Sequence, residues 1–279
     1  YKDYVLPVMF VKYLSDSYTD AVEELSKQYA GIRLERQKKY LPFMVAEGCS
    51  FYDLYQQRFA DNIGQLMNAA MRQIEADNNQ QLAGVLSAVD YNSENALGTR
   101  EHKNAILRDL LEDFEPLDLR PSAIEVKEGQ VPADVIGDAY EYMIGQFASM
   151  AGKKAGSFYT PADVSEIMAR IVDVQPGERV YDPTCGSGSL LIKAAKKQNS
   201  KEVSIYGQEV NGSSVAMAKM NMYIHEIRDA KIGWGDTLAN PVFLDADGNL
   251  LLFDAIVANM PFSKDKWASG FNPGGESSG

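Results

Sequence analysis

The chain has 279 residues, 45% of them hydrophobic, and its 27 Lys and Arg against 39 Asp and Glu give a net charge of −12. This composition excludes a fibre, a low-complexity chain and a disulfide-stapled miniprotein, and the length predicts two domains of roughly 100–200 residues each. Two cysteines and two well-separated histidines argue against a disulfide framework or a Cys/His metal cluster, and they fit a cytoplasmic protein. The acidic charge argues against a chain that grips nucleic acid alone through a broad basic surface.

The first half of the sequence is predicted to be helical. In residues 53–76, apolar side chains recur at spacings of three and four, which places one apolar stripe along a single helix. Residues 5–11 and 106–114 repeat the pattern over shorter lengths. We therefore expect helices that pack on one another.

Residues 115–132 differ from what precedes them, because they contain three prolines and few periodic apolar positions. Such a stretch is typical of a connection between domains. It predicts an N-terminal helical domain at residues 1–125 and a second domain at residues 126–279. Helical spacing resumes at residues 135–147.

Beyond residue 156, short strand-like segments alternate with helix-like ones. This alternation predicts an α/β fold with a doubly wound parallel sheet. The expected helices span residues 162–172, 189–198 and 212–227, and the expected strands span residues 179–181, 203–206 and 253–258.

A glycine-rich segment, Asp-Pro-Thr-Cys-Gly-Ser-Gly at residues 182–188, follows the first of these strands and opens a helix. In an open α/β sheet, ligands bind at the carboxyl ends of the strands. Gly186 and Gly188 permit a tight turn, and the helix N-terminus offers N–H groups to an anionic group. Asp182 at the strand end repels pyrophosphate and suits a ligand that carries an ammonium or sulfonium group.

Two further acidic residues follow the next strands. Glu209 lies 21 residues beyond Gly188, a spacing that suits hydrogen bonds from a ribose diol, although any surface Glu could stand there. Asp236 follows a possible third strand. It could accept a hydrogen bond from an adenine amino group, or it could simply be an acidic turn residue.

The tetrapeptide Asn-Met-Pro-Phe at residues 259–262 comes directly after the last expected strand. The Asn259 amide oxygen and a backbone carbonyl form a pair of acceptors for one exocyclic NH2 group, and Phe262 offers a face on which a planar base can stack. Two acceptors that hold the N–H bonds help to free the lone pair of the amine for in-line attack, without a metal or a nucleophilic serine. Asn-X-Pro is also a common turn, so the tetrapeptide alone leaves both interpretations open.

Residues 156–161, Gly-Ser-Phe-Tyr-Thr-Pro, precede the helix expected at residues 162–172. Thr160 is expected to be the N-cap of that helix, with Pro161 at its first position. Phe158 and Tyr159 stand where they could wall a pocket.

Together these segments resemble the N6-adenine DNA methyltransferases, and specifically the modification subunit of Type I restriction-modification systems. The glycine-rich segment is similar to the family's S-adenosylmethionine motif, and Asn-Met-Pro-Phe is similar to its Asn-Pro-Pro-Phe catalytic motif. Residues 156–161 resemble the element that precedes the cofactor loop, and residues 10–16 and 138–142 extend the resemblance over most of the chain. The resemblance implies an all-α domain followed by a Rossmann-like methyltransferase domain that methylates adenine N6 in DNA.

The resemblance also implies roles for individual residues. Asn259 and the carbonyl of Met260 would accept the hydrogens of adenine N6, next to Pro261, and Phe262 would stack on the flipped base. Met260 replaces the commoner Pro, but its acceptor belongs to the main chain and Pro261 still favours an extended Met260. The implied S-adenosylmethionine contacts are Phe158, Tyr159, Thr160, Asp182, Thr184, Gly186, Gly188, Glu209 and Asp236.

The resemblance further implies partners. In Type I systems a separate specificity subunit recognises the target, so the implied partners are DNA, that subunit, a restriction subunit and a second modification subunit. Residues 1–150 carry 14 Lys and Arg against 24 Asp and Glu, whereas residues 151–279 carry 13 against 15. The acidity thus belongs to the helical half, and we expect DNA affinity to depend on a more basic partner.

Two alternatives remain open from the sequence. Only 17 residues follow Phe262, whereas a methyltransferase sheet of this class has further strands there, so we expect a C-terminally incomplete domain; Met260 is a second departure from the family's pattern. Both features also fit a scaffold protein with a decayed methyltransferase fold. A protein glutamine N5-methyltransferase uses a similar acceptor pair, although the long helical half and Phe262 in place of Tyr favour DNA.

Overall fold

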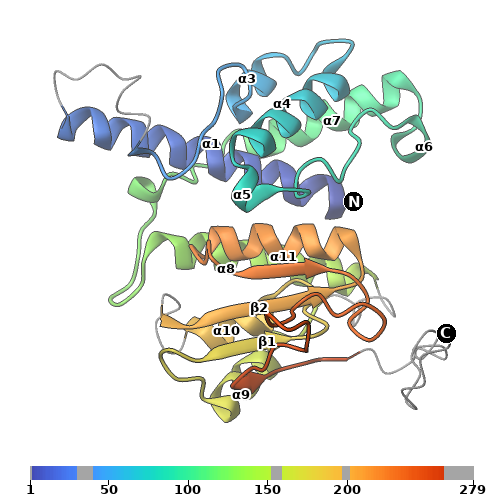
Figure 1. The fold of residues 1–279 in the computed structure, drawn as a ribbon. Coiled ribbons are helices and arrows are strands. Elements are labelled where there is room, and N and C mark those ends of the chain that lie inside the picture. The colour runs from blue at the N-terminus through green and yellow to red at the C-terminus, as the bar shows by residue number, and fades with distance from the viewer. Residues whose placement is uncertain (1, 30–39, 152–158, 197–201, 261–279) are drawn as a thin grey trace. The chain divides into compact units, whose positions relative to one another are not determined.

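The computed structural model describes residues 2–29, 40–151, 159–196 and 202–260 (Figure 1). The chain divides into two compact units, Tyr1–Tyr140 and Glu141–Gly279. Within the described ranges, no helix is both long enough and apolar enough to cross a bilayer.

The described part of the first unit is helical and contains no strand. Neighbouring helices α1, α3, α4 and α7 pack on one another, and α8 starts in this unit and continues into the second. The helices are α1 (Lys2–Gln28), α3 (Phe51–Gln56), α4 (Ile63–Asp77), α5 (Asn79–Leu82), α6 (Glu94–Leu97), α7 (Arg100–Phe114) and α8 (Pro132–Ala151), with a short 3-10 turn, η2 (Pro121–Ala123).

The single helix expected at residues 53–76 is wrong, because the structure has two helices there, α3 and α4. The end of α3 tightens when the N–H of Gln57 donates to the carbonyl of Leu54 (3.1 Å), one residue short of the α-helical spacing. Residues 57–62 then form turns, and α4 begins at Ile63. Apolar spacing cannot reveal this break, since the stripe resumes on the far side with Ile63, Met67 and Ile74, all buried.

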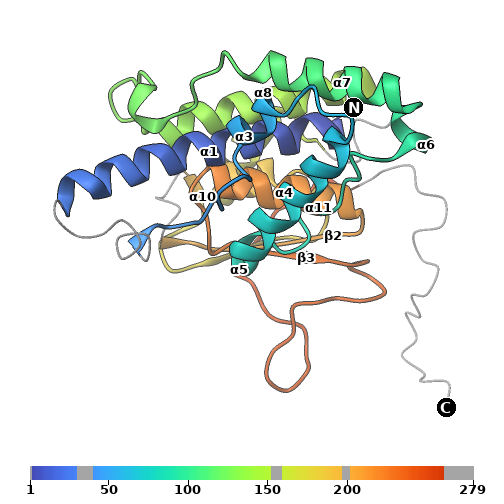
Figure 2. The same ribbon diagram turned by 90° about the horizontal axis from the view of Figure 1, so that it is seen from above.

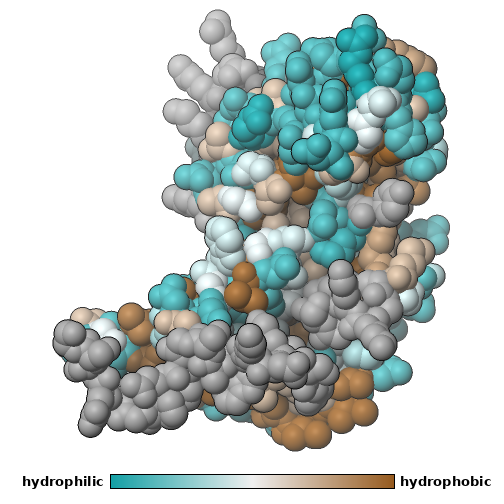
Figure 3. All heavy atoms as spheres, turned by 90° about the vertical axis from the view of Figure 1, so that its right-hand side faces the viewer, coloured by the Kyte–Doolittle hydropathy of each residue, from teal (hydrophilic) through white to brown (hydrophobic). Residues whose placement is uncertain are grey.

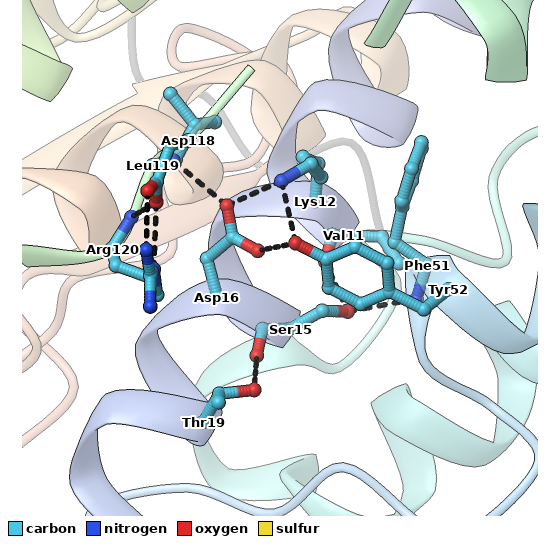
Figure 4. Close-up of polar contacts among 10 residues, drawn as sticks. All are labelled: Val11, Lys12, Ser15, Asp16, Thr19, Phe51, Tyr52, Asp118, Leu119 and Arg120. Atoms are coloured by element: carbon cyan, nitrogen blue, oxygen red, sulfur yellow. Dashed lines mark hydrogen bonds and ion pairs between the residues drawn. The ribbon is translucent and has the colours of Figure 1, made fainter. Parts of the chain in front are cut away.

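The connection after α7 is held on α1 by two acidic residues one helical turn apart, and Figure 4 shows the first of them, Asp16. The N–H of Leu119 donates to Asp16 (2.8 Å), and the N–H of Ser122 donates to Asp20 (2.7 Å). Asp16 also pairs with Lys12 and accepts a hydrogen bond from the Tyr52 hydroxyl (2.6 Å). The side chains of Lys12 and Asp16 are completely buried, so this ion pair lies in the interior of the unit.

The second unit contains a four-stranded sheet in the order β3-β2-β1-β4, with every pairing parallel. This arrangement confirms the parallel α/β sheet expected from the alternating pattern. Its strands are β1 (Arg179–Asp182), β2 (Ser204–Glu209), β3 (Lys231–Trp234) and β4 (Ala255–Ile256), and its helices after α8 are α9 (Ala162–Val172), α10 (Ser189–Lys196) and α11 (Gly212–Ile224).

The two faces of the sheet are covered differently. On one face, Val180 and Ile205 pack into a hydrophobic core with residues of α9, α10 and α11. On the other face, the Tyr181 ring stacks on Phe253 with centroids 4.4 Å apart, and Phe243 packs edge-on against Tyr181. Both phenylalanines come from the segment between β3 and β4, which Figure 2 shows as an orange-red loop that leaves the sheet and returns. Aromatic side chains therefore cover this face of the sheet.

β4 is shorter than the strand expected at residues 253–258. Among the described residues it lies at the edge of the sheet and pairs with β1, itself only four residues long. Phe253 turns onto the aromatic face instead of continuing the ladder. Main-chain bonds from Asp254 to Arg179 (3.0 Å) and from Val257 to Tyr181 (2.9 Å) nevertheless hold the segment in register on both sides of β4.

Helix α9 carries an apolar stripe that faces solvent. Val164, Ile167 and Ile171 are 45%, 58% and 76% exposed, whereas Ser165 and Ala169 are buried. Apolar surface is visible at the lower end of the molecule in Figure 3, the end at which α9 lies in Figure 1. Small residues thus make the close contact of α9 with α10, and the larger aliphatic residues point away from it.

Candidate functional site

The predicted polar residues gather at one edge of the sheet, because parallel strands end on the same side. Asp182 ends β1 and Glu209 ends β2, while Asp236 follows β3 and Asn259 follows β4. The strand order places β2 and β3 on one side of β1 and β4 on the other. The chain therefore continues from β1 to one side of the sheet and returns as β4 on the other side. The point where the strand order reverses in this way is the position where open α/β sheets bind ligands.

The loop between β1 and α10 has the tight conformation expected of its glycines. Gly186 and Gly188 have φ angles of 53° and 77°, in the left-handed region. A Cβ on Gly188 would lie 2.9 Å from the Met222 side chain of α11. Asn221 of the same helix donates to the carbonyl of Ser187 (3.1 Å). Helix α11 therefore supports the loop directly, and the positive φ of Gly188 disfavours any other residue there.

The carboxylates of Asp182 and Glu209 accept hydrogen bonds from this loop, and the two residues are only 2% and 6% exposed. Asp182 accepts hydrogen bonds from the Thr184 N–H (2.9 Å) and its hydroxyl (3.5 Å). Glu209 accepts from Gly186 (3.1 Å) through one oxygen and from Asn211 (2.8 Å) through the other. Burial raises the pKa of Asp182 to about 7, and the negative charge of Glu209 adds to the rise. A cationic ligand group would relieve this unfavourable placement of two carboxylates.

Asp236 takes part in the turn after β3. Its carboxylate accepts from the N–H groups of Leu238 (2.9 Å) and Ala239 (3.2 Å). The preceding Gly235 donates its N–H to the carbonyl of Glu209 (3.0 Å), so the turn is joined to the end of β2. Asp236 is thus an acidic turn residue, one of the two roles considered from the sequence. Its half-buried carboxylate lies at the same edge of the sheet as Asp182 and Glu209.

Two residues near this edge were not predicted from the sequence. Gln208 is fully buried; its amide nitrogen donates to Asn240 (2.9 Å), and its oxygen accepts from Val242 (3.1 Å). Trp234, 70% exposed at the end of β3, donates its indole N–H to the carbonyl of Val210 (3.0 Å). Gln208 could have been noticed in the sequence, because it is a polar amide within a strand-like segment and directly precedes Glu209.

Thr160 is not the N-cap of α9, and that expectation is wrong. The first helical bond runs from Ser165 to the carbonyl of Pro161 (3.0 Å), so Pro161 occupies the cap position. The Thr160 hydroxyl instead accepts a hydrogen bond from the Asn259 side-chain amide (3.2 Å). Residues 99 positions apart in the sequence therefore meet at this edge of the sheet.

The remaining predicted residues are placed as follows. The Tyr159 ring packs against Gly145 of α8, where a Cβ would lie 3.2 Å from its hydroxyl, and burial raises the pKa of Tyr159. The Met260 side chain is 59% exposed. Phe158, Pro261 and Phe262 lie outside the described residues. In the described ranges, no group of three or more His, Cys, Asp or Glu side chains is placed to hold a metal ion.

The chemistry of this edge suits a ligand that combines a cationic group with a diol. Asp182 offers a buried negative charge beside a loop with main-chain N–H groups. Each Glu209 oxygen makes one of the two hydrogen bonds that a carboxylate oxygen can accept, which leaves capacity for hydroxyl groups. Asn259 adds an amide oxygen on the other side of β1.

Comparison with known families gives two matches that together cover most of the chain. The family model described as N-6 DNA Methylase matches residues 131–276, and the model described as HsdM N-terminal domain matches residues 1–114. The first match covers more than half of the chain and contains the whole candidate site.

Individual relatives agree with the family models. The chain is 30% identical to the Type I restriction enzyme MjaVIII methylase subunit of Methanocaldococcus jannaschii, over 94% of this chain and 45% of that protein. It is 36% identical to the MpnII methylase subunit of Mycoplasma pneumoniae, over 62% of this chain and 33% of that protein. The chain spans about half the length, or less, of these curated relatives.

A solved structure shows the same fold. The methyltransferase subunit of a type I restriction-modification system from Streptococcus thermophilus superposes with a TM-score of 0.68 at 29% identity, over 92% of this chain and 58% of that one. The fold is therefore a Rossmann-like methyltransferase domain preceded by an all-α domain. The chain belongs to the N-6 DNA methylase family, within which it matches a methylase subunit of a Type I restriction enzyme over nearly its whole length.

Proposed function

We propose that this chain is the methyltransferase part of an adenine-specific DNA methylase that acts in the cytoplasm within a Type I restriction-modification complex and uses S-adenosylmethionine. The observation that carries the proposal is the placement of Asp182, Glu209 and Asn259 at the ends of three adjacent strands. Two buried acids at the ends of β1 and β2, and an amide after β4 on the other side of β1, would provide separate places for a cofactor and for the amine that receives the methyl group.

The cofactor contacts follow from the chemistry of each group. S-adenosylmethionine, when bound, supplies a methyl group activated by a positively charged sulfur. The Asp182 carboxylate, buried beside the glycine loop, would attract the positive charge of the ligand, and the Glu209 oxygens would accept the ribose hydroxyls. Asp236 would accept from the adenine amino group of the cofactor. Further contacts in this proposal are Phe158, Tyr159, Thr184, Gly186 and Gly188.

The acceptor site lies beyond β4. The oxygen of Asn259 and the carbonyl of Met260 would accept the two N6 hydrogens of a flipped adenine, and Phe262, after Pro261, would stack on the base. Acceptors on both hydrogens keep the lone pair of the amine pointed along the line of attack. Proximity and orientation are then the main contributions of the chain to the rate.

The proposed partners are double-stranded DNA, a specificity subunit that reads the sequence, a restriction subunit and a second modification subunit. The acidic charge of residues 1–150 supports a division of labour, because a chain of this charge gains little from contacts with phosphates.

The test uses the parent protein in full length, assembled with its specificity partner, target DNA and S-adenosylmethionine. Asn259→Ala should lower the formation of N6-methyladenine, measured by nucleoside mass spectrometry, by about 100-fold or more, the scale seen when one preorganised polar group is removed. Cofactor binding in calorimetry should persist. Asn249→Ala, a matched change in an exposed turn before β4, should leave methylation unchanged.

Unchanged adenine methylation by Asn259→Ala would show that the assigned role is wrong. Methylated glutamine in peptides without methylated adenine would move the reaction to a protein substrate. A complete protein that does not bind S-adenosylmethionine would favour a scaffold.

A further inference from the structure

The hydrogen bond between Asn259 and Thr160 joins two well-anchored segments. Asn259 lies two residues beyond Val257, which is 2% exposed and donates its N–H to Tyr181 of β1 (2.9 Å). Thr160 lies just before α9, which the buried residues Ser165 and Ala169 fix against α10. With both main chains fixed by the same core, the 3.2 Å contact between the side chains becomes a defined feature of the site.

We propose that Thr160 is a positioning residue that holds the side-chain NH2 of Asn259, so that the amide oxygen faces the amine that is to be methylated. This inference rests on the proposed function. It gives Thr160 a role different from the cofactor contact that the family resemblance implies.

The reason lies in the two ends of a carboxamide. A half-turn about the last side-chain bond exchanges the NH2 donor and the oxygen acceptor while the shape of the group hardly changes. With the oxygen toward an exocyclic amine, the amide accepts an N–H; with the NH2 toward it, two donors face each other. In the observed contact the Thr160 hydroxyl accepts from the NH2 group. Because a hydroxyl can also donate, the contact holds the plane of the carboxamide, and the substrate amine, itself a donor, selects the observed orientation in which the oxygen is left to accept from it.

The experiment compares three substitutions at position 160 in the complete assembly. Thr160→Val and Thr160→Ala remove the hydroxyl, and we expect kcat for adenine methylation to fall about 3- to 10-fold, the factor that one neutral hydrogen bond is worth. Thr160→Ser keeps the hydroxyl and should retain most of the activity. The Kd for S-adenosylmethionine should stay within twofold for all three. Thr19→Val is the matched control, since its hydroxyl donates to a carbonyl of α1 in the helical unit.

A fall in cofactor affinity with unchanged kcat would overturn the proposal and make Thr160 a cofactor contact. Equal losses for Thr160→Ser and Thr160→Val would also overturn it, because the hydroxyl would then be irrelevant. The use of both Val and Ala separates the loss of the hydroxyl from a change in shape, and all rates are compared below the unfolding temperature of each variant.

A measurement without turnover tests the contact independently of the proposed function. In the chain labelled with 15N-asparagine, the side-chain NH2 protons of Asn259 should exchange slowly with solvent in the unmodified protein and in Thr160→Ser, and faster in Thr160→Val. Equal exchange in all three would refute the contact. If instead the unmodified assembly forms no N6-methyladenine but exchange follows the expected order, the proposed function fails while the geometry stands.

Discussion

Asp182 combines two requirements that oppose each other. Its side chain is almost completely buried and close to a second carboxylate, which disfavours the ionised form in the folded protein. The same ionised form is what a cationic ligand needs. The residue therefore costs stability in the free chain at neutral pH, and a bound cation would recover that stability.

The pH dependence of stability follows from the pKa of Asp182. The pKa is about 7 in the folded chain, against roughly 3.9 in an unfolded one. Between these values the folded state keeps a proton that the unfolded state has released, so stability falls as the pH rises from about 4 to about 7. Asp182→Asn, which has no proton to lose, should raise the unfolding temperature relative to the unmodified chain at pH 8. The corresponding difference in the free energy of unfolding is at most about 4 kcal/mol at pH 8, and it should shrink toward pH 5.

Thermal unfolding at several pH values, together with calorimetry of S-adenosylmethionine binding, checks this expectation. The variant should also bind the cofactor more weakly. Asp245→Asn is the control: hydrogen bonds from the N–H groups of Asn249 and its neighbours lower the pKa of Asp245, so removal of this charge should not stabilise the chain at pH 8. A variant at position 182 that is less stable than the unmodified chain at pH 8 would show that burial of the charge is not the dominant effect.

At the scale of elements, helix α1 binds the connection between α7 and α8 through Asp16 (Figure 4) and Asp20. The two acids differ in environment, because Asp16 also neutralises the buried Lys12, whereas Asp20 lies nearer the surface. Substitutions at these two positions can therefore distinguish an effect on the stability of the whole helical unit from a local effect on the attachment of residues 115–131 to α1.

Asp16→Ala should destabilise the helical unit by about 3–5 kcal/mol, because it leaves the Lys12 ammonium buried without its carboxylate. Asp20→Ala should cost less than about 1 kcal/mol but should speed hydrogen exchange at Ser122 and protease cleavage within residues 115–131. Denaturant unfolding and limited proteolysis distinguish the two effects. Equal unfolding midpoints for both variants would show that the Lys12 ammonium carries no penalty when its carboxylate is removed.

The elements also show what a sequence can reveal and what it cannot. The β1 strand, the helix α9 and the glycine loop follow from periodicity and turn chemistry within about ten residues, so they could be predicted. The break between α3 and α4 could not, because the apolar stripe continues on both sides of it. The bond between Thr160 and Asn259 depends on the register of β4 on β1, which arises only when segments far apart in sequence pair. The domain boundary at residues 125 and 126 stays a prediction.

At the scale of the whole molecule, the charge lies mainly in one half of the sequence. Residues 1–150 carry ten more acidic than basic side chains, and residues 151–279 carry two more. Binding of DNA through phosphate contacts requires a surplus of Lys and Arg at the interface, with the release of counterions.

The isolated chain should therefore bind duplex DNA weakly, with a Kd no tighter than about 10⁻⁴–10⁻⁶ M near physiological salt, the usual range of non-specific binding. Fluorescence anisotropy with a labelled duplex at 50 and 200 mM salt would measure both the affinity and its salt dependence. Addition of the specificity subunit should tighten binding and steepen the salt dependence. Tight, strongly salt-sensitive binding by the chain alone would contradict this division of labour.

The position of Trp234 makes its fluorescence suitable for following ligand binding. Its indole ring is largely exposed, yet its N–H is bound to the carbonyl of the residue that follows Glu209. The other tryptophan of the chain is Trp267, so Trp267→Phe would leave a single tryptophan, at the end of β3, which can be excited selectively over the tyrosines. The emission of that indole would shift when a ligand excludes water from the edge of the sheet. The molecule thus contains its own optical probe at the position where cofactor binding is proposed.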